Sequence, residues 1–159
     1  MNWTPVFAAM LLTAPSGAPP LHSAGKQAAG PGEVSAAMAF LTALGRLDFD
    51  AAGGFLADDV VLDLPFAGKG LAVRGREDVL HFLRKSMAGS AGAIEYRLDH
   101  AYPSPEAGAV VLEISTQGRT AAGRGYVNRL VAVFAFRGGK IALFREYFNP
   151  APLAASARD

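Results

Sequence analysis

Apolar residues recur at every third or fourth position in two segments of the chain, residues 33–47 and 77–87. This spacing places them along one face of a helix. Between these segments, residues 51–57 predict a short helix that Asp50 caps. The two apolar stripes consist of Val34, Met38, Leu41 and Leu44 and of Val79, Phe82, Leu83 and Met87. We therefore expect three helices in the first half of the chain.

The second half of the chain alternates between apolar and polar positions, which is typical of β-strands. Gly138-Gly139 between two apolar runs predicts a tight hairpin, because both glycines adopt positive φ easily. An earlier apolar run is expected to end, or to lie at a sheet edge, at Pro65. The predicted strands cover residues 60–66, 94–102, 109–117, 124–136 and 141–149. Helices followed by antiparallel strands predict an α+β domain with helices on one face of a curled sheet.

Composition supports one domain and excludes several classes of function. The chain has 159 residues, 51% of them hydrophobic, which is enough to bury a proper core. A net charge of +1 without any run of like charges argues against nucleic-acid binding. The sequence contains no cysteine, so disulfides, thiolate nucleophiles and cysteine-ligated metals are excluded.

Residues 1–32 differ from the rest because Ala, Pro and Gly dominate them. The apolar run at residues 6–12 is too short to span a membrane, so we expect no membrane span. We expect a disordered extension of a cytoplasmic protein. The alternative is export through a weak signal cleaved near Ala24, although no Lys or Arg precedes the apolar run. The folded domain is expected over residues 33–150, with a tail at 151–159.

Glu146 is the best single catalytic candidate. Alternation in the last strand places it on one face between Phe144 and Phe148. A carboxyl group in apolar surroundings has a raised pKa, which suits it to proton transfer near neutral pH. The alternative is a surface glutamate, or one that is ion-paired to a neighbouring strand.

Polar residues on the neighbouring strands could join Glu146. Glu113, Ser115 and Gln117 share one face of their strand, and Asn128 lies on the next strand. If Glu113, Asn128 and Glu146 turn to one cavity, they supply the few convergent polar groups of a small-ligand pocket. The alternative is the solvated face of an antiparallel sheet.

No metal or cofactor site is expected. The three histidines, His22, His81 and His100, show no pairing at metal-ligand spacing. The sequence also lacks a nucleophile elbow, a phosphate-binding Gly-Lys loop and a dinucleotide fingerprint after a strand.

Several stretches resemble the SnoaL-like family of nuclear transport factor 2-like proteins. Near the C-terminus these are Tyr126-Val127-Asn128, Gly138-Gly139-Lys140-Ile141 and Phe144-Arg145-Glu146-Tyr147-Phe148-Asn149-Pro150. Upstream, the similar stretches are Ala57-Asp58-Asp59-Val60-Val61, Leu64-Pro65-Phe66-Ala67 and Arg74-Gly75-Arg76-Glu77. The resemblance implies a cone-shaped fold in which a strongly bent antiparallel sheet and three helices enclose an apolar pocket. It also implies a homodimer, which agrees with apolar residues on both faces of the last strand.

The family includes ketosteroid isomerases, scytalone dehydratase, polyketide cyclases, limonene-epoxide hydrolases and the phenazine-biosynthesis A/B proteins. Glu146 matches one catalytic aspartate of the epoxide hydrolases, but Glu113 and Ser115 replace their arginine and second aspartate. It also matches the acid-base glutamate of the phenazine proteins, whereas Phe82 replaces their catalytic histidine. These departures argue against both reactions.

The resemblance implies a catalytic pair, Glu146 and Asn128, with Tyr126 as an alternative holder of the substrate oxygen. The implied ligand-binding residues are Leu41, Leu44, Leu62, Leu64, Phe82, Ser86, Glu113, Ser115, Gln117, Tyr126, Leu130, Phe144 and Phe148. Three functions stay open: a cofactor-independent isomerase, cyclase or lyase acting on a cyclic, polyketide-like or steroid-like molecule, a binding module for a small apolar molecule, and a structural dimerisation domain.

Overall fold

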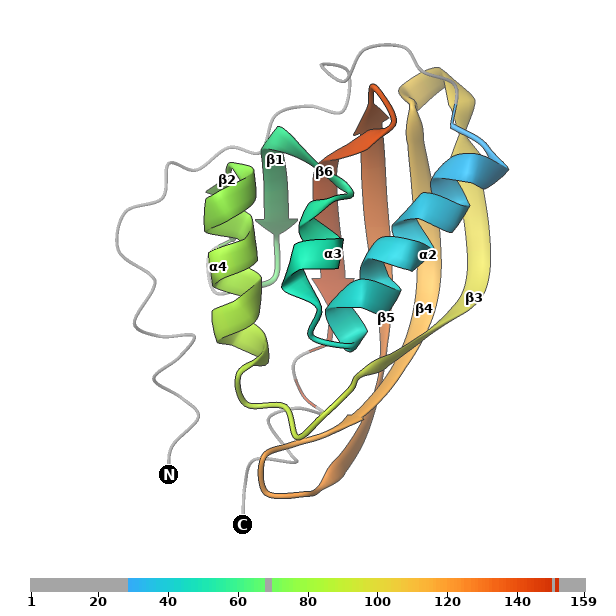
Figure 1. Ribbon diagram of the computed structural model, residues 1–159. Coiled ribbons are helices and arrows are strands. Elements are labelled where there is room, and N and C mark those ends of the chain that lie inside the picture. The colour runs from blue at the N-terminus through green and yellow to red at the C-terminus, as the bar shows by residue number, and fades with distance from the viewer. Residues whose placement is uncertain (1–28, 68–69, 150, 152–159) are drawn as a thin grey trace.

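Three helices cover one face of a six-stranded sheet (Figure 1). The computed structural model describes residues 29–67, 70–149 and 151. In chain order the described elements are α2 (Pro31–Gly45), α3 (Phe49–Gly53), β1 (Leu56–Leu64), β2 (Leu71–Arg74), α4 (Arg76–Met87), β3 (Glu95–Ser104), the 3-10 turn η2 (Pro105–Ala107), β4 (Ala109–Arg119), β5 (Gly125–Arg137) and β6 (Lys140–Phe148). The expected α+β fold class is confirmed.

The strands lie in the order β2-β1-β6-β5-β4-β3. Every neighbouring pair is antiparallel except β1 and β6, which run parallel, so the sheet is mixed rather than wholly antiparallel. The four-residue strand β2 was not predicted, because so short a segment shows no clear alternation. β1 ends at Leu64, directly before Pro65, and β2 rather than β1 forms the edge.

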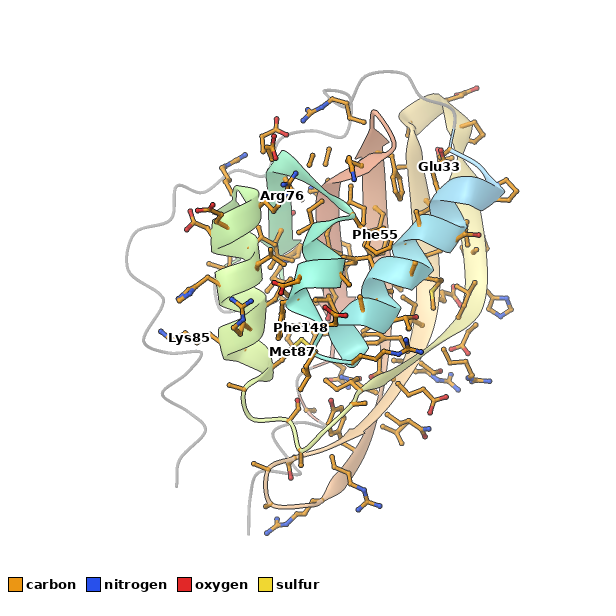
Figure 2. The ribbon with its side chains drawn as sticks, in the orientation of Figure 1. Glu33, Phe55, Arg76, Lys85, Met87 and Phe148 are labelled. Atoms are coloured by element: carbon orange, nitrogen blue, oxygen red, sulfur yellow. The ribbon has the colours of Figure 1, made fainter. Side chains whose placement is uncertain are left out.

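The first helix begins two residues before its predicted start. Pro31 occupies its first turn, and the Glu33 carboxylate accepts a hydrogen bond from the Gly30 amide at 2.8 Å (Figure 2). Ala29 is buried. Residues 29–32 therefore belong to the domain, whereas the rest of the predicted extension lies outside the described residues.

Asp48, not Asp50, caps α3. The Asp48 carboxylate accepts a hydrogen bond from the Ala51 amide at 3.0 Å, and the helix is over by Gly53. The predicted span of 51–57 was wrong at both ends because residues 56 and 57 already pair within β1.

An aromatic cluster fills the core between the helices and the sheet. The rings of Phe134 and Phe144 stack with centroids 4.8 Å apart, and Phe40 of α2 meets Phe144 edge-on at 5.4 Å. These rings fix the angle at which α2 crosses β5 and β6. Glu146 follows Phe144 on the same face of β6, so the cluster also anchors the strand that carries the main candidate residue.

The glycine pair between β5 and β6 forms the predicted hairpin. Gly138 and Gly139 have φ values of 57° and 73°, which side-chain-bearing residues rarely adopt. In the described part of the chain, no helix has the length and apolar character needed to cross a bilayer.

Candidate functional site

Glu146 lies on the helix-facing side of β6, as predicted. Its partner across β5 is Ala132, and the neighbouring rungs pair Phe134 with Phe144 and Leu130 with Phe148. Phe148 lies between the sheet and the helical layer (Figure 2). The side chain opposite Glu146 on β5 is therefore small, whereas aromatic residues flank Glu146 along its own strand.

Burial raises the pKa of Glu146 to about 7. Within the described residues, its carboxyl group has no hydrogen-bond partner and no ion pair. Part of the side chain nevertheless remains accessible to a water-sized sphere. Burial therefore favours the protonated form of the Glu146 carboxyl group more than solvent does for an exposed glutamate.

Tyr96 of β3 lies close to Glu146 and was missed by the sequence interpretation. Burial raises its pKa above the ordinary value, and the charges of Glu146 and Tyr126 raise it further. A neutral phenol with an elevated pKa acts as a hydrogen-bond donor throughout the physiological range. Alternation within the predicted strand at 94–102 would have placed Tyr96 on the same face as Leu98, facing the helices.

Tyr126 of β5 extends this polar group towards solvent. Burial raises its pKa, although its side chain is only partly buried. The ring lies over Gly118 of β4, where an added Cβ would come within 2.9 Å of the phenol oxygen. Glycine at position 118 therefore lets Tyr126 lie across β4 in the direction of β3 and Tyr96.

Tyr96 of β3 pairs with Thr116 of β4, and Thr116 pairs with Asn128 of β5. The Asn128 amide donates to the Asn149 carbonyl at 2.7 Å, and its oxygen accepts from the Arg129 amide at 2.8 Å. Asn128 is thus engaged in tying the end of β6 to β5. The Thr116 hydroxyl, by contrast, has no partner among the described residues.

Several polar side chains on the helix-facing side of the sheet have no hydrogen-bond partner among the described residues. Among the described side chains, Arg76 Nε is the sole nitrogen or oxygen atom that is buried from water and has no hydrogen-bond partner. Four other polar side chains form no hydrogen bond with a described residue, yet their polar atoms are not sealed from water: Glu146, Tyr96, Tyr126 and Thr116. Because buried polar groups are normally hydrogen-bonded, this arrangement is typical of groups that meet water or a ligand.

Glu113, Ser115 and Gln117 lie on the opposite face of the sheet. The register pairs Ile114 with Leu130, so these three residues alternate outward, away from Glu146. Each contacts β3 instead: Tyr102 donates to Glu113 at 3.3 Å, Ser115 to Asp99, and Gln117 to Glu95. The prediction that Glu113 converges with Glu146 on one cavity was wrong, because Glu113 pairs with Val131 and Val131 with Tyr147, whose side chain lies on the face opposite Glu146.

The apolar residues that were predicted to line a ligand site pack in the core between the helices and the sheet. Ser86 is partly buried, and its hydroxyl donates a hydrogen bond to the Phe82 carbonyl at 2.9 Å. Its hydroxyl proton is therefore already engaged within α4. The remaining residues pack into one core cluster with Phe148 at its border: Leu41, Leu44, Leu62, Leu64, Phe82, Leu130 and Phe144. This cluster supplies the apolar surroundings that desolvate Glu146.

Two surface clefts differ in their relation to this site. One, of about 880 Å³, is centred on outward-facing residues, including Arg97, Glu113 and Arg129. The other, of about 780 Å³, lies where the end of α2 meets the β4–β5 hairpin, and Tyr96 and Tyr126 line it. We call the second one the end cleft. The end cleft is the one that bears on the candidate site, because Tyr96 lines it and the charge of Glu146 raises the pKa of Tyr96.

Residues 37–144 match the SnoaL-like domain. The chain belongs to the SnoaL-like family. Within the described ranges, no three His, Asp or Glu side chains gather in a way that could hold a cation. The family match and the fold agree with the resemblance noted in the sequence.

Solved structures share this SnoaL-like fold. An epoxide hydrolase of the limonene-epoxide hydrolase type from M. tuberculosis is 26% identical, with a TM-score of 0.64 over 79% of this chain and 88% of that one. A candidate polyketide cyclase from Xanthomonas campestris is 27% identical, with a TM-score of 0.65 over 80% and 97%. A nuclear transport factor 2-like protein from Anabaena variabilis is 24% identical, with a TM-score of 0.65 over 74% and 87%. No curated protein matches the sequence.

Proposed function

We propose that this SnoaL-like protein binds a small apolar cyclic molecule with a carbonyl group and moves a proton at the carbon beside that carbonyl. The observation that carries the proposal is Glu146, an unpaired carboxyl group whose pKa burial raises to about 7, beside the buried phenol of Tyr96. The reaction type would be that of an isomerase, cyclase or dehydratase. It requires no cofactor.

The proposed chemistry uses one base and one hydrogen-bond donor. The Glu146 carboxylate takes a proton from the α-carbon, the C–H electron pair forms a carbon–carbon double bond, and the carbonyl oxygen becomes an enolate oxygen. The Tyr96 hydroxyl donates to that oxygen. Protonated Glu146 then returns the proton to the same or another carbon. A positioned base contributes roughly 10²–10⁴-fold to such a rate, and one oxyanion donor roughly 10²–10³-fold.

The roles differ from those expected for Asn128. Its amide already holds the Asn149 carbonyl and its oxygen the Arg129 amide, so we assign it to positioning the end of β6. Tyr96 takes the oxygen-holding role, and Tyr126 remains at the boundary with the end cleft.

A binding module without catalysis is the second candidate. Glu146 is the sole carboxyl group with a raised pKa among the described residues, and the described lining of the end cleft contains no histidine. In this case Glu146 would anchor one polar end of an apolar ligand. Binding without proton transfer would distinguish this function from the first.

Hydrogen–deuterium exchange of 2-tetralone, an apolar bicyclic ketone with acidic α-hydrogens, tests the proposed chemistry. Followed by NMR in D₂O, the catalysed rate should rise with pH through about 7 and then level off, because the base must be ionised. Tyr96→Phe should lower the plateau by about 10²-fold without moving its midpoint much. Tyr147→Phe, on the outer face of the same sheet, is the control and should keep the rate.

Two results would contradict this reaction. A catalysed rate that does not depend on pH between 5 and 9 would exclude Glu146 as the base. Binding of 2-tetralone without any enhanced exchange would favour the binding module instead.

We also propose a homodimer formed through the outer face of the sheet. Val127, Phe66 and Tyr102 are 68%, 64% and 51% exposed there, and Phe66 packs edge-on against Tyr147 at 5.5 Å. Exposed apolar residues gathered on one sheet face favour association with a second copy. Light scattering at micromolar concentration should give twice the 16.5 kDa chain mass. Val131→Glu should yield monomers, and a monomeric wild type would contradict the proposal.

A further inference from the structure

The end cleft has a charge pattern that the proposed proton transfer does not explain. Its lining includes two basic residues, Arg46 and Arg119, and one acidic residue, Glu95. The Glu95 carboxylate already accepts a hydrogen bond from Gln117. Two arginines against one carboxylate give the described lining of the cleft a net positive charge.

The two arginines come from different elements and face the same space. Arg46 follows the last turn of α2, and within the described residues its side chain has no ion pair or hydrogen bond. Arg119 ends β4, where one guanidinium nitrogen donates to the Gly123 carbonyl at 3.0 Å. That bond leaves further N–H groups of the Arg119 guanidinium to bind an anion.

The end cleft shares its two tyrosines with the candidate site. Tyr96 and Tyr126 line it, and the Tyr96 phenol is near enough to Glu146 for the carboxylate to raise its pKa. Glu146 itself does not line the cleft, so the cleft includes the two tyrosines but not the carboxyl group. A volume of about 780 Å³ is within the range of small-molecule sites.

We propose that the ligand enters through the end cleft and carries an acidic group, a carboxylate or a similar oxyanion, which Arg46 and Arg119 bind. The apolar ring of the ligand passes between the tyrosines, and its carbonyl group reaches Tyr96 and Glu146. This inference rests on the proposed function and names its substrate class: a cyclic keto acid rather than a neutral ketone. Arginine suits this role because its planar guanidinium binds carboxylates with two parallel hydrogen bonds.

A matched pair of probes tests the proposal, 2-naphthoate and its neutral methyl ester, with binding measured by calorimetry or ligand-observed NMR. The wild type should bind 2-naphthoate at least about tenfold more tightly than the ester at low salt. This preference should shrink as salt rises to 0.5 M, because exposed charges are screened.

The double variant Arg46→Gln/Arg119→Gln should lose the preference while its affinity for the ester stays within about twofold. Arg46→Gln alone should lose part of the preference, which guards against loosening of the hairpin that Arg119 holds. The control Arg84→Gln/Arg129→Gln removes the same number of charges from other surfaces and should keep the preference.

The outcomes separate this inference from the proposed function. Equal binding of both probes by the wild type, or a preference that survives in the double variant, overturns the acidic-group proposal and leaves the apolar site intact. Failure of both probes to bind at millimolar concentration overturns the apolar-ligand function and this inference with it.

Discussion

Glu146→Gln should lower the rate of 2-tetralone exchange at least about a hundredfold while the ketone still binds. Glutamine keeps the shape and the hydrogen-bonding reach of the side chain but cannot take up a proton. Binding should persist because the apolar surroundings, including Phe144 and Phe148, are unchanged. NMR exchange rates together with a binding titration check both parts. An unchanged exchange rate would remove Glu146 from the mechanism.

The same variant should also change how the unfolding free energy depends on pH, and the direction of the change follows from the pKa of Glu146. In the folded protein the pKa of Glu146 is about 7, against 4.5 for a solvated glutamate, so folding favours the protonated acid. The stability of the wild type should therefore fall as pH rises from about 4.5 to about 7 and then remain constant. Glutamine does not titrate. Relative to the wild type, the variant should gain about 2 kcal/mol of unfolding free energy between pH 5 and pH 8.

Urea unfolding at the two pH values, at one protein concentration, measures this gain. Asp50→Asn, at an exposed carboxyl group on α3, provides a control that should show no comparable change with pH. A Gln variant that is less stable than the wild type by the same amount at both pH values would indicate that Glu146 is not desolvated.

Arg145→Met should destabilise the protein by about 3–5 kcal/mol, because it leaves the buried Asp63 carboxylate without its cation. Arg145 Nε lies 2.6 Å from Asp63 Oδ2, and the two side chains are 18% and 11% exposed. The pair joins β1 to β6 at the single parallel contact in the described sheet. Denaturant unfolding measures the loss, and α-proton exchange should fall as well, since β6 carries Glu146.

Two companion variants show whether the cost comes from burial. Arg137→Met breaks the ion pair between Arg137 and Asp59, whose side chains are 45% and 68% exposed, respectively. This change should lower the unfolding free energy by about 1 kcal/mol or less. The double variant Asp63→Leu/Arg145→Met removes both buried charges and should recover much of the stability that the single change loses. Equal losses for Arg145→Met and Arg137→Met would contradict the assignment of a buried pair.

Local periodicity predicted which segments form helices and strands and which face of β6 carries Glu146. The stripe around Phe40, Leu41 and Leu44 and the alternation around Glu146 are set by residues three, four or two positions apart. These patterns depend only on residues that are close together in the sequence, so the sequence determined them independently of the rest of the fold. The family signature added the order of elements and the covering of one sheet face by helices.

Contacts between distant segments decided what periodicity could not. The parallel pairing of β1 with β6, the register that turns Glu113 away from Glu146, and the approach of Tyr96 to Glu146 all join residues far apart in the chain. One-residue differences in register move a side chain to the opposite face of a sheet, and alternation within a single strand carries no information about register between strands. For that reason the sequence by itself determined the identity and the face of Glu146, whereas only the tertiary structure decided which groups share its site.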